Sequence, residues 1–292
     1  MNVTAVGGNN AGLNARAATF ARSTVVEFID RPHLDVFNQE RLIPPNINLH
    51  MKLMPSPNDF VCKSAAPCQG AQQENYKLVI QSVNLIIHSK KLTSTAHGAL
   101  MDLLVHQNMQ HHLSRVQMKH LSIPAKQTSI NFDNVFTGAL QDLVIVGLVS
   151  DADLAGGYQR NPFNFKSFGV NRIELKRNIT SWPSKGYTPN FANRQYIKAY
   201  MTFFQELECD NGYKSVSLTP SDCSNGYTLY AFKIIDGSIR PGTYGPRSKS
   251  ATGSARLEVS FAAAVNENIK VILLYQMLGR LEFDRFNAVL VL

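Results

Sequence analysis

Hydrophobic and polar residues alternate along the last quarter of the chain in the way that a half-buried strand requires. In residues 254–261, Leu257, Val259 and Phe261 share one face of an extended chain. Arg256 and Glu258 share the other face. Because successive side chains of a strand point to opposite faces of its sheet, we predict that the three apolar residues point inward and the two charged residues outward.

Similar stretches, rich in β-branched and aromatic residues and separated by Gly, Pro, Ser and Asn, predict further strands. They cover residues 24–29, 46–54, 76–90, 114–123, 143–148, 170–177, 229–235, 255–262 and 269–275, with a weaker pair at 281–284 and 288–292. Many strands, long loops and one or two short helices predict an all-β fold, a β-sandwich of jelly-roll type. Residues 1–23 are expected to form an arm or an inter-domain connection, and residues 24–292 one jelly-roll domain.

Segments that break the strand pattern predict the helices. Residues 190–207 repeat Tyr196, Tyr200 and Phe204 every four residues, and Asn190 is a favoured N-cap. We interpret this stripe as an amphipathic helix over the open end of the sandwich rather than as a cofactor site. Residues 94–107 are expected to contain a shorter helix.

Composition narrows the class of protein only a little. Of the 292 residues, 44% are hydrophobic and 17% are charged, which favours a surface that meets other subunits. The net charge of +8 favours contact with polyanions such as nucleic acid, but no long basic run is present. No stretch approaches the roughly 18 apolar residues of a membrane span. The first 14 residues lack the layout of a signal peptide, so we expect an intracellular or virion-borne protein.

The residue types that carry catalysis or bind metals are not arranged for either purpose. The four cysteines, Cys62, Cys68, Cys209 and Cys223, form no metal-type doublet, and a Cys209–Cys223 link is the one disulfide worth testing. A histidine-rich stretch contains His106, His111, His112 and His120, and we interpret it as structural. Asp151 and Asp153 precede Gly156 but lack the acidic twelfth ligand of a calcium loop. No nucleophile elbow occurs, so we expect no enzyme, no cofactor and no metal.

Several stretches, taken in order, resemble the C-terminal half of the hexon-like major capsid proteins of adintoviruses and Polinton/Maverick elements, copies of which occur in animal genomes. The similarity is carried chiefly by Asn161-Pro162-Phe163-Asn164-Phe165 and Gly226-Tyr227-Thr228-Leu229-Tyr230-Ala231-Phe232. Further matching stretches are residues 14–16, 31–42, 48–53, 145–149, 196–200, 256–258 and 261–262.

The resemblance implies a double jelly-roll capsid subunit that trimerises into pseudo-hexagonal capsomers, with itself and other capsid proteins as partners and the virion and host nucleus as locations. In that family an N-terminal jelly roll precedes the matched part, so Met1 would fall near the junction between the two rolls, and assembly of a full shell is in doubt. Phe163, Phe165 and Phe168 are expected to serve as core residues or as an aromatic anchor for a subunit contact. The long loops at 55–75 and 236–253 are further expected contact surfaces.

Two other functions fit a β-sandwich with long loops. A ligand-binding module, lectin-like or cytokine-like, would use the loops to hold its ligand. A cupin-like enzyme would need a cluster of His and Glu on paired strands, and the sequence offers only the isolated His88 and His120 there.

Overall fold

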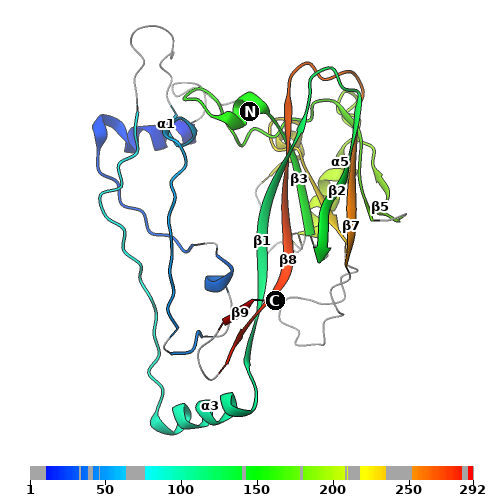
Figure 1. Cartoon of the computed structure of the whole chain (residues 1–292). Helices are drawn as coiled ribbons and strands as arrows, with labels where there is room; N and C mark the ends of the chain where they lie inside the picture. Colours follow the sequence, from blue (N-terminus) through cyan, green and yellow to red (C-terminus); the bar gives the residue numbers. More distant parts are fainter. Residues whose placement is uncertain are drawn as a thin grey trace. The chain divides into compact units, whose positions relative to one another are not determined.

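The computed structural model describes residues 11–32, 34–38, 42–45, 47–63, 76–139, 143–177, 180–207, 209, 218–234, 252–284 and 289–291. Strands dominate these residues, and they form two antiparallel sheets (Figure 1). The strands are β1 (Met109–Ile123), β2 (Ser129–Ala139), β3 (Leu143–Ser150), β4 (Val170–Arg177), β5 (Thr180–Tyr187), β6 (Leu229–Lys233), β7 (Thr252–Phe261), β8 (Ile269–Phe283) and β9 (Val289–Val291).

The helices are short, and the longest has 13 residues. The α-helices are α1 (Ala11–Thr19), α2 (Asn58–Val61), α3 (Ser94–His106), α4 (Asp151–Ala155), α5 (Ile197–Glu206) and α6 (Pro220–Ser224). Two 3₁₀ turns, η1 (Ala21–Ser23) and η2 (Asp35–Asn38), complete the set for the described residues. No described helix has both the length and the apolar character needed to cross a bilayer.

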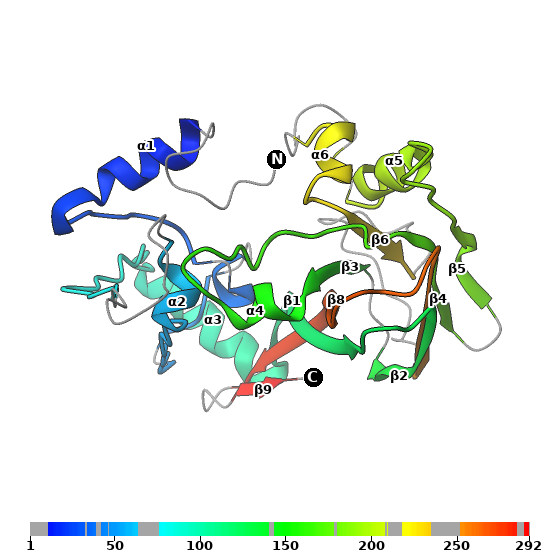
Figure 2. The ribbon, with the colours of Figure 1, turned by 90° about the horizontal axis from the view of Figure 1, so that it is seen from above.

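The order of the strands identifies the fold. One sheet has the order β1-β8-β3-β6, with β9 added beside β8, and the other has the order β2-β7-β4-β5. Successive strands therefore cross repeatedly between two facing sheets, which Figure 2 shows as two layers. Eight strands wound in this order form a jelly roll, so the predicted all-β jelly-roll fold is confirmed.

The chain divides into two compact units, which are described separately. The first contains Met1–Val26, Pro57–Tyr76 and Val116–Met277, and hence most of the sandwich. The second contains Glu27–Ser56, Lys77–Arg115 and Leu278–Leu292, with η2, α3 and β9 as its described regular elements besides the ends of β1 and β8. The predicted boundary after residue 23 remains a prediction.

The core lies between the two sheets and consists of alternate residues from their strands. In β7, Leu257, Val259 and Phe261 are buried, whereas Arg256 is exposed and Glu258 half-buried on the outer face. The predicted orientation of this strand is thus confirmed. Strand β3 contributes Val144, Val146 and Leu148 from the facing sheet. Burial of such side chains is the main favourable contribution to folding.

Three sequence-predicted strands are wrong, and two strands were missed. Residues 24–29, 47–54 and 76–90 belong to no strand within the described chain, and residue 46 of the second predicted strand lies outside the described residues. A composition typical of strands does not indicate whether a neighbouring strand is present for pairing. Strand β2 escaped prediction because a bulge between Phe132 and Phe136 breaks its alternation, and β5 because it contains a proline and a glycine.

Helix α5 covers a face of a sheet rather than the open end of the sandwich. Its Phe203 and Phe204 pack with Ala231 of β6, on the side of the sheet opposite the main core. The helix begins at Ile197, seven residues later than predicted. Asn190 instead closes a turn, in which its backbone pairs with Gln195 and its side chain accepts a hydrogen bond from the Asn193 N–H.

A proline scan of α5 should separate its first turn from its interior. Ile197 is the first residue of the helix and is 50% exposed, and the backbone N–H groups of the first turn have no partner within the helix, so Ile197→Pro should be tolerated comparatively well. Met201 lies one turn into the helix and is 46% exposed, so Met201→Pro should cost about 3 kcal/mol or more through the backbone alone. Urea unfolding of both variants measures the difference, and equal losses would contradict the observed start of the helix.

Candidate functional site

The sequence stretches that carry the family resemblance pack against one another. The loop containing Phe165 lies between β3 and the start of β6. The Phe165 N–H donates to the Gly226 carbonyl at 2.8 Å, and the Thr228 N–H donates to the Phe165 carbonyl at 2.9 Å. On the other side, the Lys166 N–H donates to the Leu148 carbonyl at 3.0 Å. The loop is therefore held by backbone hydrogen bonds on both sides.

Two glycines permit this close packing. A Cβ atom on Gly147 would lie 2.6 Å from the ring of Phe165 and 2.9 Å from Leu229, closer than van der Waals contact allows. Gly226 has a φ of +104°, and a Cβ there would lie 2.7 Å from the Asn164 amide oxygen. The sequence therefore places glycine where side chains from the loop occupy the space.

The three phenylalanines of this loop have different environments. Phe165 packs on Gly147, and Phe168 packs against the main core. Phe163 is 62% exposed, and its ring meets Phe60 edge-to-face with 6.0 Å between centroids. Phe163 is thus the one of the three that is available for contact with another molecule, while the other two serve the fold.

Phe60 is brought to this loop by the short segment around α2. The Gly157 N–H donates to the Asp59 carbonyl at 3.0 Å, and the Lys63 amine donates to the Gly157 carbonyl at 3.1 Å. Burial lowers the pKa of Lys63, an effect that nearby Asp59 partly offsets. The two aromatic rings therefore form a supported apolar patch, which we call the Phe60–Phe163 patch.

A second candidate surface is the outer face of the four-stranded sheet, where charged residues of β4 and β7 lie in register. Glu174 is directly opposite Glu258, and Lys176 is directly opposite Arg256. Like charges opposite each other are destabilising, but Lys176 contacts opposite charges along its own strand and diagonally on β7. The Lys176 amine lies 2.8 Å from Glu174 and 2.6 Å from Glu258.

Further ion pairs extend this array on both sides. Arg172 lies 3.0 Å from Glu174, and Arg256 forms an ion pair with Asp133 of β2. The resulting charged ladder contains three cations and three carboxylates: Arg172, Lys176, Arg256, Asp133, Glu174 and Glu258. The ladder as a whole is electrically neutral.

Glu174 is the buried member of the ladder, with 1% of its surface exposed. Burial by itself would raise the pKa of this carboxyl group, but hydrogen bonds from Lys176 and Arg172 outweigh it and lower the pKa. Gly186 of β5 lies against the Glu174 side chain with a φ of +59°, and a Cβ at Gly186 would come within 3.0 Å of Glu174. The same contacts raise the pKa of Lys176, chiefly through its hydrogen bond to Glu174.

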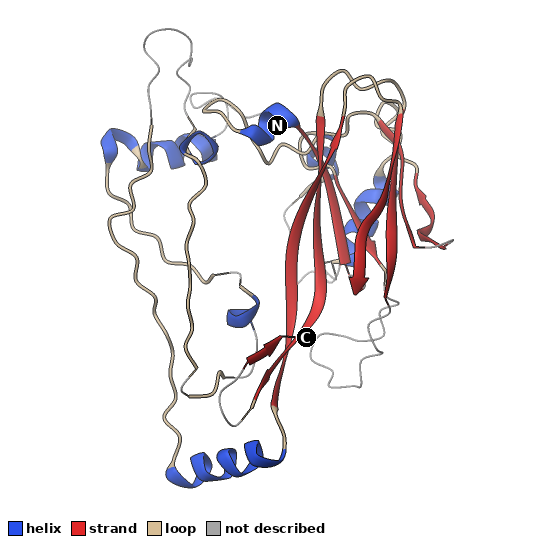
Figure 3. Cartoon of the chain, in the orientation of Figure 1, coloured by secondary structure: helices blue, strands red, loops and turns tan. Residues whose placement is uncertain are grey.

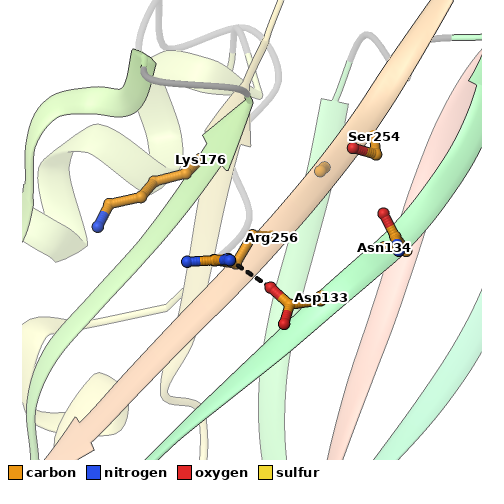
Figure 4. Close-up of a pocket in the computed structure, with 6 residues that line it drawn as sticks. Asp133, Asn134, Lys176, Ser254 and Arg256 are labelled. Atoms are coloured by element: carbon orange, nitrogen blue, oxygen red, sulfur yellow. Dashed lines mark ion pairs between the residues drawn. The ribbon is translucent and has the colours of Figure 1, made fainter.

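A shallow hollow of about 440 Å³ opens beside the ladder. It is lined by Asp133, Asn134, Lys176, Ser254, Ala255 and Arg256, and Figure 4 shows the Arg256–Asp133 ion pair at its wall. Small-molecule sites of this volume are lined mostly by apolar and aromatic side chains. Here the cations already have carboxylate partners, so the hollow lacks both an apolar wall and uncompensated charge.

The remaining predicted residues are not brought together. Cys209 and Cys223 are free thiols, and Cys62 is free as well, so the structure contains no Cys209–Cys223 disulfide. Burial raises the pKa of Cys223 to about 11. Cys68 and most of the loops at 55–75 and 236–253 lie outside the described residues.

The histidines and the Asp151–Asp153 pair have separate structural surroundings. His111 is buried edge-to-face against Phe283, with 5.0 Å between the ring centroids. Asp153 pairs with Arg160 and Lys166, and Asp151 pairs with Lys270, so cationic side chains neutralise both carboxylates. Across the described part of the chain, no three His, Cys, Asp or Glu residues lie close enough together to hold a metal ion.

Comparison with known proteins gives limited information. No family model matches the chain. Over 204 residues it is 22% identical to Uncharacterized protein F54H12.2 of Caenorhabditis elegans, an alignment that covers 69% of this chain and 48% of the relative. The chain thus spans about half the length of this curated relative.

Among solved structures, the chain is similar to VP54 of PBCV-1, fitted into a reconstruction of the virophage Sputnik. The TM-score is 0.37 and the sequence identity is 8%, and the match covers 65% of this chain and 52% of VP54. A chain of the Sputnik virophage is similar with a TM-score of 0.34 and 12% identity, and the match covers 63% of this chain and 39% of that chain. Because these scores are below 0.5, the jelly-roll assignment rests on the strand order.

Glu174→Gln tests the charged ladder and should destabilise the protein in a pH-dependent way. The folded-state pKa of Glu174 lies below the unfolded value of about 4.3. The carboxylate therefore stabilises the fold fully above about pH 4.3, and this contribution is lost as the pH falls through the folded-state pKa. We expect a loss of about 1–3 kcal/mol near neutral pH that shrinks below about pH 4, measured by urea unfolding.

The control for this prediction is Arg160→Gln, which removes a half-exposed partner of Asp153. Exposed ion pairs contribute roughly 0–1 kcal/mol, so this variant should change stability little. A Glu174→Gln effect that stays constant down to acidic pH would show that the carboxylate charge is not the stabilising feature.

Gly147→Ala tests the packing of the Phe165 loop. The added methyl group would overlap the Phe165 ring, and such overpacking costs typically about 1–3 kcal/mol. A combined Gly147→Ala and Phe165→Leu variant should recover part of that loss, because neighbouring substitutions are not additive. Gly98→Ala is the matched control, since nothing lies within 4 Å of its Cβ position. Thermal unfolding is measured for these three variants and for Phe165→Leu alone, and an additive pair would argue against direct contact.

Proposed function

We propose that this protein is a structural capsid subunit, the second jelly roll of a hexon-like major capsid protein of the adintovirus and Polinton/Maverick type, and that it self-associates into trimeric capsomers. One observation carries the proposal. The two stretches that most resemble that family, around Phe165 and Gly226, are hydrogen-bonded to each other in a complete eight-stranded jelly roll. The resemblance therefore concerns residues that build the fold together, which supports common ancestry more strongly than scattered identities would.

The proposed role is mechanical, and the features of the surface support it. The outer sheet face carries charges that are already paired, and the cations that line the hollow beside them, Lys176 and Arg256, both have carboxylate partners. Capsid subunits need a rigid body with contact patches rather than a reaction centre. We accordingly place the protein in the virion, with assembly in the host cell nucleus and with other capsid proteins as partners.

We assign the Phe60–Phe163 patch as one contact of the trimer. Phe163 is highly exposed, and its ring packs edge-to-face against Phe60. Aromatic residues dominate the energetics of specific interfaces. The loops at 55–75 and 236–253 remain predicted contact regions. A stable interface should bury at least about 1,000 Å² in total, so the patch would be the centre of a larger contact.

Sedimentation velocity and particle imaging test the proposal over about 1–100 μM, the range in which weak specific assembly appears. A species of three times the 32.4 kDa chain mass is expected at high concentration. Phe163→Lys should weaken the trimer by about tenfold or more, since a charge would enter its centre. Ile197→Lys, an exposed residue on α5, is the control and should leave the trimer intact.

The ligand-binding alternative predicts a different result. A lectin-like or cytokine-like module would remain a monomer over the same range and would bind a carbohydrate or protein ligand. The hollow beside Lys176 and Arg256 is the place where such a ligand would be sought. A strict monomer would therefore overturn the capsid proposal and favour the module.

A further inference from the structure

Residues 79–87 form an apolar, extended segment outside the jelly roll. Within the described part of the chain, residues 79–92 belong to no strand or helix, and Figure 3 draws them as loop. The exposed fractions of six aliphatic residues in this segment lie between 42% and 68%: Val79, Ile80, Val83, Leu85, Ile86 and Ile87. Single exposed aliphatic residues are ordinary on protein surfaces, but six within nine positions mark an interaction site.

The sequence of this segment has the character of a strand that is covered on both faces. Val79, Val83, Leu85 and Ile87 occupy one face of an extended chain, and Ile80 and Ile86 lie on the other. Most of these residues are β-branched, which favours pairing in a sheet. An extended segment with an open backbone edge pairs readily with another strand, because its N–H and C=O groups are available.

We propose that residues 79–87 pair in antiparallel fashion with the same segment of a second copy of this chain, about a two-fold axis at Val83. Such an axis keeps each residue on its own face of the pair, so each residue lies opposite one from the same face. In this register most apolar residues face apolar residues. The facing pairs are Val79 with Ile87, Ile80 with Ile86, Gln81 with Leu85, Ser82 with Asn84, and Val83 with its own copy.

The charges around the segment favour this arrangement over a parallel one. Residues 76–92 contain Lys77, Lys90 and Lys91 but no acidic residue. Antiparallel pairing in the proposed register places Lys77 opposite Ser89. Parallel in-register pairing would instead place every lysine opposite its own copy, which is unfavourable. A two-fold axis is also the commonest symmetry of protein self-association.

The area available fits a weak but specific contact. An aliphatic side chain of this size offers roughly 100 Å² of apolar surface. With Leu78 at the end of the segment, the exposed fractions give about 400 Å² for each copy and about 800 Å² for the pair. This value is below the limit of about 1,000 Å² for stable specific interfaces, so the dimer should be weak and concentration-dependent.

This contact is distinct from the proposed trimer. It lies in the second compact unit, whereas the Phe60–Phe163 patch lies in the first. A two-fold contact joins subunits in pairs and would link one trimer to another, so each association can exist without the other.

Two charge variants that remove the same apolar groups test the register. Ile80→Lys with Ile86→Lys places like charges opposite each other on both sides of the axis, whereas Ile80→Glu with Ile86→Lys places opposite charges there. Sedimentation equilibrium over about 1–200 μM measures the two-fold association. Hydrogen exchange of the amides at 79–87 is followed across the same concentrations, and Ile197→Lys is the control for an exposed apolar residue elsewhere.

We expect amide protection at 79–87 in the wild type to rise with concentration, together with a species of twice the chain mass or a doubled trimer. The like-charge variant should lose this association by about tenfold or more, while the opposite-charge variant should retain more of it. Circular dichroism should report an unchanged fold in both variants, because the substituted positions are exposed.

Three results would overturn the inference. They are two-fold association that is equal in both charge variants, amides at 79–87 that stay unprotected at the highest concentration, and amides that are already protected in the dilute monomer. A trimer with unprotected amides would overturn this inference and leave the proposed function standing. A two-fold dimer without any trimer would do the reverse.

Discussion

The sandwich depends on the alternation of residues in its central strands. Leu257 and Val259 of β7 face Val271 and Leu273 of β8 across the core, and all four are fully buried. Because the side-chain period of a strand is two, a slip of one residue in β7 would bring Arg256 and Glu258 into this core. Burying unpaired charges is far more costly than the hydrophobic gain of a single residue, so the alternation fixes the register of the entire sheet.

The outer faces of the two sheets, which point away from the core, differ in chemistry. On the β3–β6 side, the outward residues Ile145 and Ala231 are apolar, and α5 covers them with Phe203 and Phe204. On the β4–β7 side, the outward residues are charged and neutralise one another. The first face is therefore closed by the chain itself, whereas the second remains a polar surface.

Much of this arrangement could be predicted from the sequence, and the failures have physical reasons. The strand with Leu257, Val259 and Phe261 followed from alternation, which records burial on one side. Strand β2 did not, because Asn134 adopts a left-handed conformation at a bulge and disrupts the period. The segment at 76–90 has the composition of a strand, but composition cannot reveal whether a neighbouring strand is present.

The site was predictable to a smaller extent. Phe163, Phe165 and Phe168 could be selected as a group, but only the fold separates the exposed Phe163 from the two packed rings. Gly147 lies in a stretch that resembles the family, but its role could not be predicted because it depends on Phe165, which is 18 residues away in sequence and adjacent in space. The burial of Glu174 could not be predicted either, because it depends on the close approach of Gly186 in the next strand.

The neutral charged ladder of β2, β4 and β7 affects how fast partner molecules reach this face of the protein. Its three cations and three carboxylates produce little field beyond their immediate surroundings, so the chain's net charge of +8 comes from residues elsewhere. Long-range attraction accelerates encounters only where a net potential exists. A partner that docks on this face would therefore arrive by unsteered diffusion, at a rate nearly independent of ionic strength, whereas a polyanion would be drawn to other parts of the surface.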